Sequence, residues 1–271
     1  MQTAIVADLK PLELGEILDG ALTIFRRHFG LFVKIGVAAL WLPVAGTIYI
    51  QLAGGREQHL LLTLGVGIIQ YFAGLFLTAS AIRVISDSYL GRAPQLADAL
   101  ALGASKIWSL FVVGLGKGLI LGLIIIVIGV LGAVALPTLG AAGGLAALAV
   151  IVLFLGGLWF LTFVACGYAV TTPALVLEHL HGAFDAFGRS WELTRSFKRK
   201  IFGTFVVAFL IVYIPGAAIG GIGAALMLEA RAAAQAIEVV SAALPIILTP
   251  LFSCVLTLMY YDLRVRREAF D

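Results

Sequence analysis

Ionisable side chains within or beside long apolar segments are the residues of this sequence that could do chemistry. Lys117 lies about eight residues inside an apolar segment, where a charge is costly and usually marks a site for an ion or a substrate. Its long side chain could instead reach back to a membrane surface. We treat the following residues as candidate membrane-depth or interface sites: Lys117, Asp19, Arg83, Asp87, Glu178 and Asp262.

Two groups of ionisable residues have simpler structural explanations. Arg83 and Asp87 are four residues apart, a spacing at which an ion pair forms on one face of a helix. His179 and His181 are two residues apart and would face different sides of a helix, with no cysteine or third histidine beside them. We therefore expect a loop there rather than a metal site, although Glu178 and Asp185 are nearby.

The sequence contains none of the short motifs that mark common catalytic sites. H-E-x-x-H, the P-loop and G-x-S-x-G are all absent. Cys166 and Cys254 lie in apolar segments, where a thiol usually serves packing. We expect no catalytic residue, cofactor, metal or nucleic-acid partner, and we predict that the protein is not an enzyme. An intramembrane enzyme built from scattered carboxylates is the alternative left open.

The composition predicts an all-α integral membrane protein. Hydrophobic residues make up 62% of the 271 residues and charged residues 12%, with a mean hydropathy of +1.09. Soluble domains are about 45–50% apolar and about 25% charged. We expect a single polytopic membrane domain over residues 1–271. The N-terminal sequence MQTAIVADLKPLELGE lacks the pattern of a cleaved signal peptide, so we expect the first span to direct insertion.

Six apolar segments are long enough to cross about 30 Å of hydrocarbon. They cover approximately residues 29–53, 60–85, 109–136, 145–170, 201–228 and 234–261. Amphipathic segments lie before the first, third and fifth of them, at 12–32, 95–108 and 183–200, and we expect interfacial helices there. Gly118 and Gly122 form a GxxxG pair, which permits close helix packing.

The three amphipathic segments align without gaps. Asp19, Arg27, Phe29 and Phe32 match Asp98, Lys106, Trp108 and Phe111 at an offset of 79, and Glu192, Lys200, Phe202 and Phe205 at an offset of 173. The returning spans end near Asp87, Glu178 and Asp262. We predict a three-fold repeat of an interfacial helix plus a helical hairpin, with units at 12–92, 93–182 and 183–267. The interfacial anchors would be Arg27, Phe29, Lys106, Trp108, Lys200 and Phe202. Alternatively, any such helix needs a basic anchor and an aromatic belt, and this need alone could produce the match.

The distribution of basic residues predicts the orientation. Of the 18 lysines and arginines, all but Arg56 and Arg231 fall on the side of the N-terminus. Basic residues in short loops favour the cytoplasmic side of the membrane. We therefore expect both termini to be cytoplasmic.

Three stretches resemble a known family. PLELGEILDGALTIFRRHFG, AFGRSWELTRSFKRKIFG and YYDLRVRREAFD are similar to the glycerophosphoryl diester phosphodiesterase membrane domain of bacterial membrane proteins. In that family the module stands alone or is fused to a soluble phosphodiesterase, and we expect the stand-alone form because no polar segment here could hold the catalytic domain. The resemblance implies a six-helix module of the bacterial inner membrane, with no catalytic residue to carry over.

These observations favour a non-catalytic inner-membrane module that organises lipids or partner proteins. Its partners would be membrane lipids, a second copy of the chain or another membrane protein. The alternative is a small transporter or channel for a lipid or amphipathic metabolite, because proline-interrupted spans and Lys117 are typical of membrane binding sites.

Overall fold

The computed structural model describes residues 11–53, 59–135, 143–226 and 231–268 of the chain. Helices account for 88% of the structure and the described residues contain no strand, which confirms the all-α prediction. The helices are α1 (Leu14–Arg27), α2 (Phe29–Leu52), α3 (Leu60–Tyr89), α4 (Leu96–Ala135), α5 (Gly143–Gly167), α6 (Thr171–Leu177), α7 (Asp185–Thr194), α8 (Lys198–Leu226), α9 (Arg231–Ala243) and α10 (Pro245–Glu268).

Six helical segments are long and apolar enough to cross a membrane, as the sequence predicts. They are Phe29–Leu52, Leu60–Tyr89, Leu96–Ala133, Leu148–Leu177, Lys198–Ile222 and Gln235–Glu268. The chain is therefore built as a multi-pass membrane protein.

Three of the expected elements have different boundaries in the structure. The amphipathic segment 95–108 continues without a break into the third span, because no proline or turn residue interrupts α4. The amphipathic segment 183–200 is divided: α7 ends at Thr194, and the basic run Lys198–Lys200 forms the first turn of α8. The last span is broken between α9 and α10 at Leu244, directly before Pro245.

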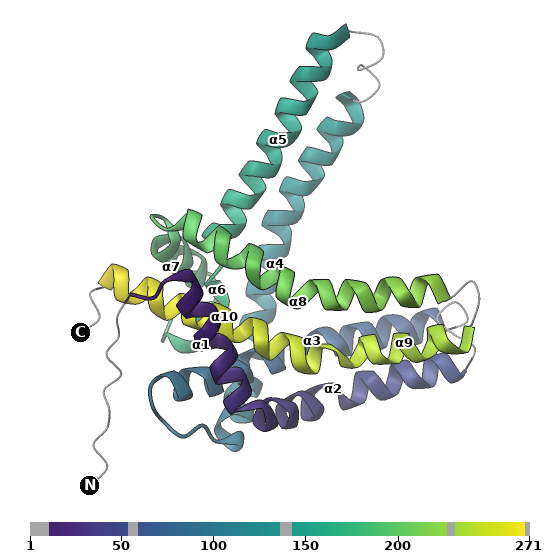
Figure 1. Ribbon diagram of the computed structural model, residues 1–271, viewed down its shortest axis with the longest axis vertical. Helices are drawn as coiled ribbons and strands as arrows, with labels where there is room; N and C mark the ends of the chain where they lie inside the picture. The colour runs from purple at the N-terminus through teal and green to yellow at the C-terminus, as the bar shows by residue number, and fades with distance from the viewer. Residues whose placement is uncertain (1–10, 54–58, 136–142, 227–230, 269–271) are drawn as a thin grey trace.

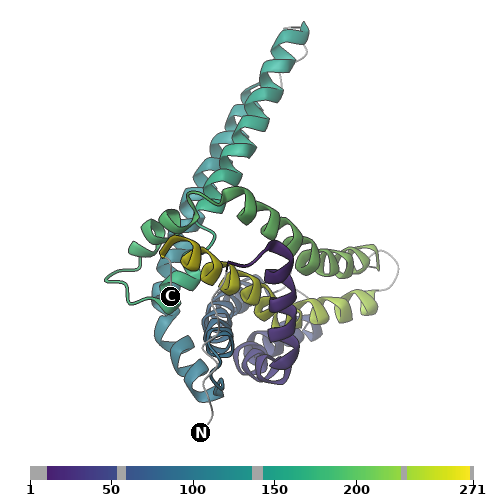
Figure 2. The ribbon, with the colours of Figure 1, turned by 60° about the vertical axis from the view of Figure 1, so that its left-hand side comes forward.

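Helix α1 packs its apolar face on the protein itself. A capping box between Glu13 and Glu16 fixes its start, and the Glu13 amide donates to the Glu16 carboxylate at 2.7 Å. Ile17 and Ala21 are buried, and the helix lies across α10 (Figures 1 and 2). The opposite, charged face of α1 is left exposed.

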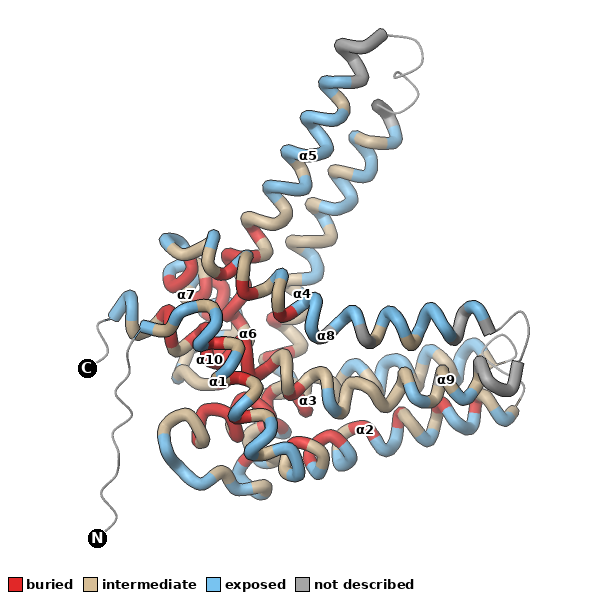
Figure 3. Tube along the Cα trace, viewed as in Figure 1, coloured by how far each residue is buried: buried red, intermediate tan, exposed pale blue. Residues whose placement is uncertain are grey.

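The buried residues gather at one end of the molecule, which we call the polar junction. There α1, α6 and α7 pack on the adjoining ends of α3, α8 and α10 (Figure 3). From this junction α2, α3, α8 and α9 extend in one direction, whereas the α4–α5 hairpin extends in another (Figure 1). Both groups expose long apolar faces along their length, as is expected of helices that lie in lipid.

Candidate functional site

Asp262 is the centre of a buried ionic cluster at the polar junction. Its carboxylate is completely buried and accepts hydrogen bonds from Lys200 Nζ at 2.5 Å and from Arg266 Nε at 3.0 Å. The backbone amide of Leu12 donates to it at 2.7 Å. These bonds compensate the buried charge and connect the segment before α1 to α8 and α10.

Glu178 is the centre of a second cluster, which joins α6, α7 and α10. Arg189 Nε donates to both carboxylate oxygens, at 3.0 and 2.8 Å, and the Tyr260 hydroxyl donates to one of them at 2.7 Å. Arg189 also pairs with Glu268. Burial alone would lower the pKa of the Arg189 guanidinium, but its hydrogen bonds to Glu178 and Glu268 and their charges raise that pKa above its usual range. Arg189 therefore stays charged, and the cluster is a permanent structural connection.

The third acidic position, Asp87, has a partner at the end of α3. Arg83 Nε lies 2.9 Å from the Asp87 carboxylate, in the i, i+4 geometry that the spacing predicts. Close by, His28 Nε2 lies 2.9 Å from the Ser88 hydroxyl. Burial and the neighbouring charge of Arg27 lower the pKa of the His28 imidazole. All three acids are thus engaged by basic side chains within the polar junction. Asp262 and Glu178 tie different helices together, whereas the Asp87 pair lies within α3.

The predicted anchor residues lie around the polar junction. Lys106 Nζ donates to the Leu175 carbonyl at 3.1 Å, and Lys200 pairs with Asp262 as described above. Asp19, Arg27, Phe29, Trp108 and Phe202 are all exposed, Trp108 by 70%. Exposed aromatic and charged side chains at the ends of apolar helices are suited to contact lipid headgroups.

Lys117 stands apart from these clusters. It is half-buried in α4 and makes no hydrogen bond or ion pair with any residue that the structure describes. A methyl group added at Gly118 or Gly122 would meet no described atom within 4 Å, so the GxxxG pair is not at a close helix contact among the described residues. The close contacts of α4 occur at other glycines: Gly103 meets α3 and Gly116 meets Phe187 of α7.

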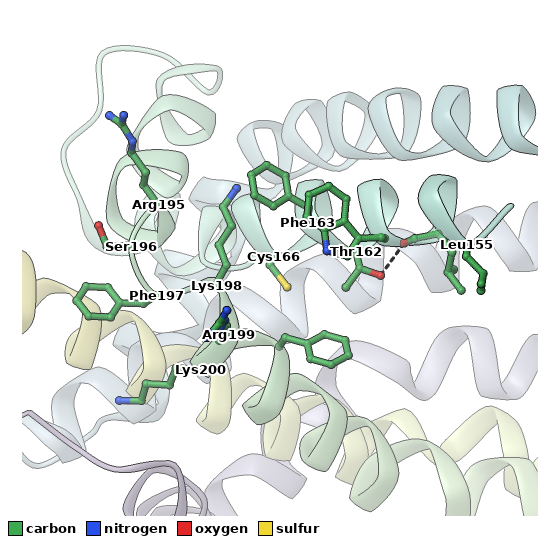
Figure 4. A pocket seen from close by; sticks show the side chains of 13 residues that line it. Leu155, Thr162, Phe163, Cys166, Arg195, Ser196, Phe197, Lys198, Arg199 and Lys200 are labelled. Atoms are coloured by element: carbon green, nitrogen blue, oxygen red, sulfur yellow. Dashed lines mark hydrogen bonds between the residues drawn. The ribbon is translucent and has the colours of Figure 1, made fainter. Parts of the chain in front are cut away.

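A crevice of about 1050 Å³ lies between α5 and the start of α8 (Figure 4). One wall is apolar and aromatic, and the other carries four basic residues. The lining residues are Leu155, Leu158, Trp159, Thr162, Phe163 and Cys166 of α5, together with Arg195, Ser196, Phe197, Lys198, Arg199, Lys200 and Phe202. None of these lining residues is acidic.

The sequence around Gly167 fixes how α7 packs on α5 beside this crevice. Because Gly167 has no side chain, the Trp191 ring lies directly on the end of α5. The hydroxyl groups of Ser190 and Thr194 donate to the Gly167 carbonyl at 2.9 and 3.0 Å. These contacts clamp α7 on α5, and α5 and α8 diverge from that point (Figure 1).

Lys198 is the basic lining residue whose ammonium lies against aromatic rings. Its Nζ lies 3.0 Å from the centroid of the Phe163 ring and 3.8 Å from the Trp191 ring, and is buried without a hydrogen-bond acceptor among the described residues (Figure 4). The rings stabilise the charge through cation–π interactions but accept none of the ammonium's three conventional hydrogen bonds. Lys200 extends away from Lys198, and Arg195 and Arg199 are exposed.

A second groove in the protein lacks the positive charge of the α5–α8 crevice. It lies between α4 and α5, has a volume of about 1240 Å³, and is lined by glycine, aliphatic residues and phenylalanine, with no charged side chain. The concentration of positive charge is therefore a property of the α5–α8 crevice and not of every gap between these helices.

Only the edge of this crevice is predicted from the sequence. Lys200 and Phe202 are predicted as interfacial anchors, whereas Lys198 is not predicted as a site residue, because its aromatic neighbours come from α5 and α7. The available signal was the basic run at 198–200 together with the i, i+4 pair Trp159 and Phe163. The loop around His179 forms no metal site in the part of the chain that the structure describes, where no three His, Cys, Asp or Glu side chains converge.

No protein family, curated protein or solved structure matches the chain in comparisons of sequence and fold. The crevice and the polar junction are therefore interpreted from their own chemistry.

Proposed function

We propose that the chain is a non-catalytic, multi-pass module of the bacterial inner membrane that organises lipids, with both termini in the cytoplasm. The observation that carries the proposal is the α5–α8 crevice, which combines an apolar wall with a basic end. A membrane lipid has the same two parts, an acyl chain and a phosphate-bearing headgroup. The clusters around Asp262, Glu178 and Asp87 would serve this function by holding the polar junction rigid.

Further features support a membrane-organising role. The amphipathic parts of the chain at α1, the start of α4 and α7 would lie along the cytoplasmic surface as three interfacial helices of a three-fold repeat. Within each proposed repeat unit, a polar side chain near the first span contacts the end of the returning helix: His28 with Ser88, Lys106 with Leu175, and Lys200 with Asp262. Lys106 and Lys200 occupy aligned positions, whereas His28 follows the aligned Arg27 by one residue, so the contact recurs at the same place in each unit but not at identical positions.

The α4–α5 hairpin extends the proposal to protein partners. Many apolar side chains of this hairpin are not covered by the contact between α4 and α5. Leu119, Leu123 and Trp159, for example, are each more than half exposed. In a bilayer, lipids, a second copy of this chain or another membrane protein would cover this surface.

Lipid retention tests the proposed function. The protein is extracted in mild detergent, and the bound lipids are counted by native mass spectrometry over increasing collision energy. We expect lipid adducts that persist after the detergent is lost, and a rise in the midpoint of thermal unfolding when bilayer lipid is added back. A protein that sheds all lipid and unfolds at the same temperature without it would contradict the proposal.

The second candidate function is a transporter or channel for a lipid or amphipathic metabolite. The break between α9 and α10 favours it, because interrupted spans often flank membrane binding sites. Lys117 would then contact the substrate, so Lys117→Met should abolish lipid scrambling or solute flux in proteoliposomes without loss of expression. Flux equal to that of empty liposomes would exclude this function for the solutes tested.

A further inference from the structure

We propose that the α5–α8 crevice binds a phospholipid of net negative charge, with its phosphate at Lys198 and Arg199 and an acyl chain along α5. This inference rests on the proposed function and deepens it, because it names the class of lipid and the residues that select it.

The charge of the crevice selects against zwitterionic headgroups. The crevice has four basic residues and no acidic lining residue. Lys200 is paired with Asp262, whereas Arg195, Lys198 and Arg199 have no carboxylate beside them in the crevice. The cationic group of a zwitterionic lipid would lie next to these like charges, whereas an anionic headgroup has no such group. The crevice also contains the N-terminus of α8, whose unpaired amide groups favour anions.

The Lys198 ammonium has no hydrogen-bond acceptor among the described residues. A buried ammonium without an acceptor is energetically unfavourable, even where two aromatic rings stabilise the charge. The flexible stem of lysine allows Nζ to move from the rings of Phe163 and Trp191 into the crevice. A phosphate there would supply oxygen acceptors for charge-assisted hydrogen bonds, and Arg199 could provide a second, bidentate contact.

The apolar wall has the length of one leaflet. It runs along α5 from Leu155 to Cys166, which is about 16 Å at the rise of an α-helix. Half of a typical hydrocarbon core is about 15 Å. A lipid whose phosphate lies at Lys198 would therefore have room for an acyl chain beside Leu158 and Trp159, within the leaflet on the side of the polar junction.

Fluorescence quenching in vesicles tests this site. The full chain is reconstituted in phosphatidylcholine with increasing fractions of dibrominated phosphatidylglycerol or dibrominated phosphatidylcholine, and the quenching of tryptophan is measured. We expect phosphatidylglycerol to be preferred by about tenfold. Both lipids carry the phosphate, but only the choline group of phosphatidylcholine would be repelled by the positive charges of Arg195, Lys198 and Arg199. Trp159→Phe should remove the selective part of the quenching, because Trp159 lines the crevice.

Matched variants assign the preference to the crevice. Lys198→Met removes the charge while its side chain can keep the contacts with Phe163 and Trp191, so it should fold as well as the wild type and lose most of the preference. Lys34→Met makes the same change at an exposed lysine on α2, which does not line the crevice, and should keep the preference. Arg199→Gln and Arg92→Gln form a second pair, because Arg92 is also exposed and outside the crevice.

The possible results separate this inference from the function on which it rests. A preference that survives Lys198→Met, or that Lys34→Met removes equally, would overturn the site while leaving a lipid-organising module. Retention of no lipid of either kind would overturn both. Excess inorganic phosphate should not displace the brominated lipid, because it has no acyl chain to fill the apolar wall. Displacement by phosphate would show a phosphate site instead.

Discussion

Lys200 and Asp262 are 62 residues apart in the sequence, and their side chains form a 2.5 Å ion pair at the point where the first turn of α8 meets α10. Lys200 also donates to the carbonyl of Leu12, whose amide donates to Asp262. The pair therefore closes a ring of contacts between the beginning, the middle and the end of the chain. Because the Asp262 side chain is fully buried, each of its partners is needed to offset the cost of burial.

Removing the carboxylate of Asp262 should strongly destabilise the polar junction. Asp262→Leu removes the carboxylate from Lys200 and Arg266, which are partly buried and would keep only the Leu12 carbonyl as an acceptor among the described residues, and we expect the free energy of unfolding to fall by about 3–5 kcal/mol. The double variant Lys200→Met/Asp262→Leu replaces the pair with apolar side chains and should lose less than Asp262→Leu alone. Thermal unfolding in a single detergent measures both. A double variant no more stable than the single one would contradict this interpretation of the pair.

The stability of the Glu178 cluster should depend on the geometry of the Arg189 guanidinium as well as on its charge. Arg189→Lys keeps the positive charge, but a lysine cannot bridge Glu178 and Glu268 with a planar, bidentate fork. We expect faster hydrogen exchange in peptides covering 171–194 and a small loss of melting temperature. Tyr260→Phe removes the hydrogen bond that the hydroxyl donates to Glu178 and the longer one that it accepts from Arg264, and should cost at least about 1.5–3 kcal/mol.

The control for this prediction is Arg92→Lys, the same change at an exposed arginine. It should leave exchange over 171–194 at the wild-type rate. Equal exchange in Arg189→Lys and in the wild type would show that the guanidinium geometry is not needed.

Protonation of His28 should destabilise the folded protein. Its pKa lies below the ordinary value of 6.5, chiefly because of burial and then because of Arg27. As the pH falls below 6.5, the folded state binds fewer protons at this site than the unfolded chain, so the free energy of unfolding decreases toward acid. The loss is complete once the pH is below the folded pKa. The melting temperature of the wild type should therefore fall more between about pH 7.5 and pH 5 than that of His28→Asn.

Ser88→Ala separates this titration from the hydrogen bond to His28. It removes the hydroxyl but keeps the imidazole, and should retain the wild-type dependence on pH. A His28→Asn variant with the full wild-type dependence would show that other groups cause it.

The sequence was sufficient for the number of spans because each span is a local property. Some 20 apolar residues in a row cannot be exposed to water, whatever the rest of the chain does. The ends of the elements were less predictable. The segment 183–200 keeps a helical pattern throughout, yet the chain turns between Thr194 and Lys198 without a glycine or proline to mark the turn. At 234–261 the proline at 245 marks the interruption: the helix departs from regular geometry at the single residue Leu244, directly before Pro245.

The candidate site depends on contacts between distant segments, which no local pattern contains. Asp262 and Lys200 were both selected from the sequence, but their pairing could not be derived from either segment alone. Lys198 was overlooked because its environment is made by Phe163 on α5 and Trp191 on α7. The GxxxG pair at Gly118 was the opposite case, a recognised motif that is not at a close helix contact among the described residues.

Two glycines of α4 should therefore respond differently to alanine. At Gly103 an added methyl group would meet the Ser80 hydroxyl and lie 3.1 Å from the Phe76 carbonyl oxygen, and the α3 backbone cannot move without disturbing the core. A methyl group added at Gly118 would have no described neighbouring atom within 4 Å. We expect Gly103→Ala to cost about 1–3 kcal/mol through overpacking. Gly118→Ala should be neutral or stabilise by up to about 1 kcal/mol, because alanine loses less backbone entropy in a helix.

Thermal unfolding of both variants, with the mass of each detergent complex measured by light scattering, checks this prediction. Because the two substitutions are identical and lie on the same helix, any difference between them reports the surroundings of each glycine. If Gly118→Ala lowers the melting temperature or reduces the mass of the complex, another helix must cover Gly118 in the assembled protein. In that case the contact predicted by the GxxxG motif would form between chains, and the α4–α5 hairpin would be part of an oligomer interface.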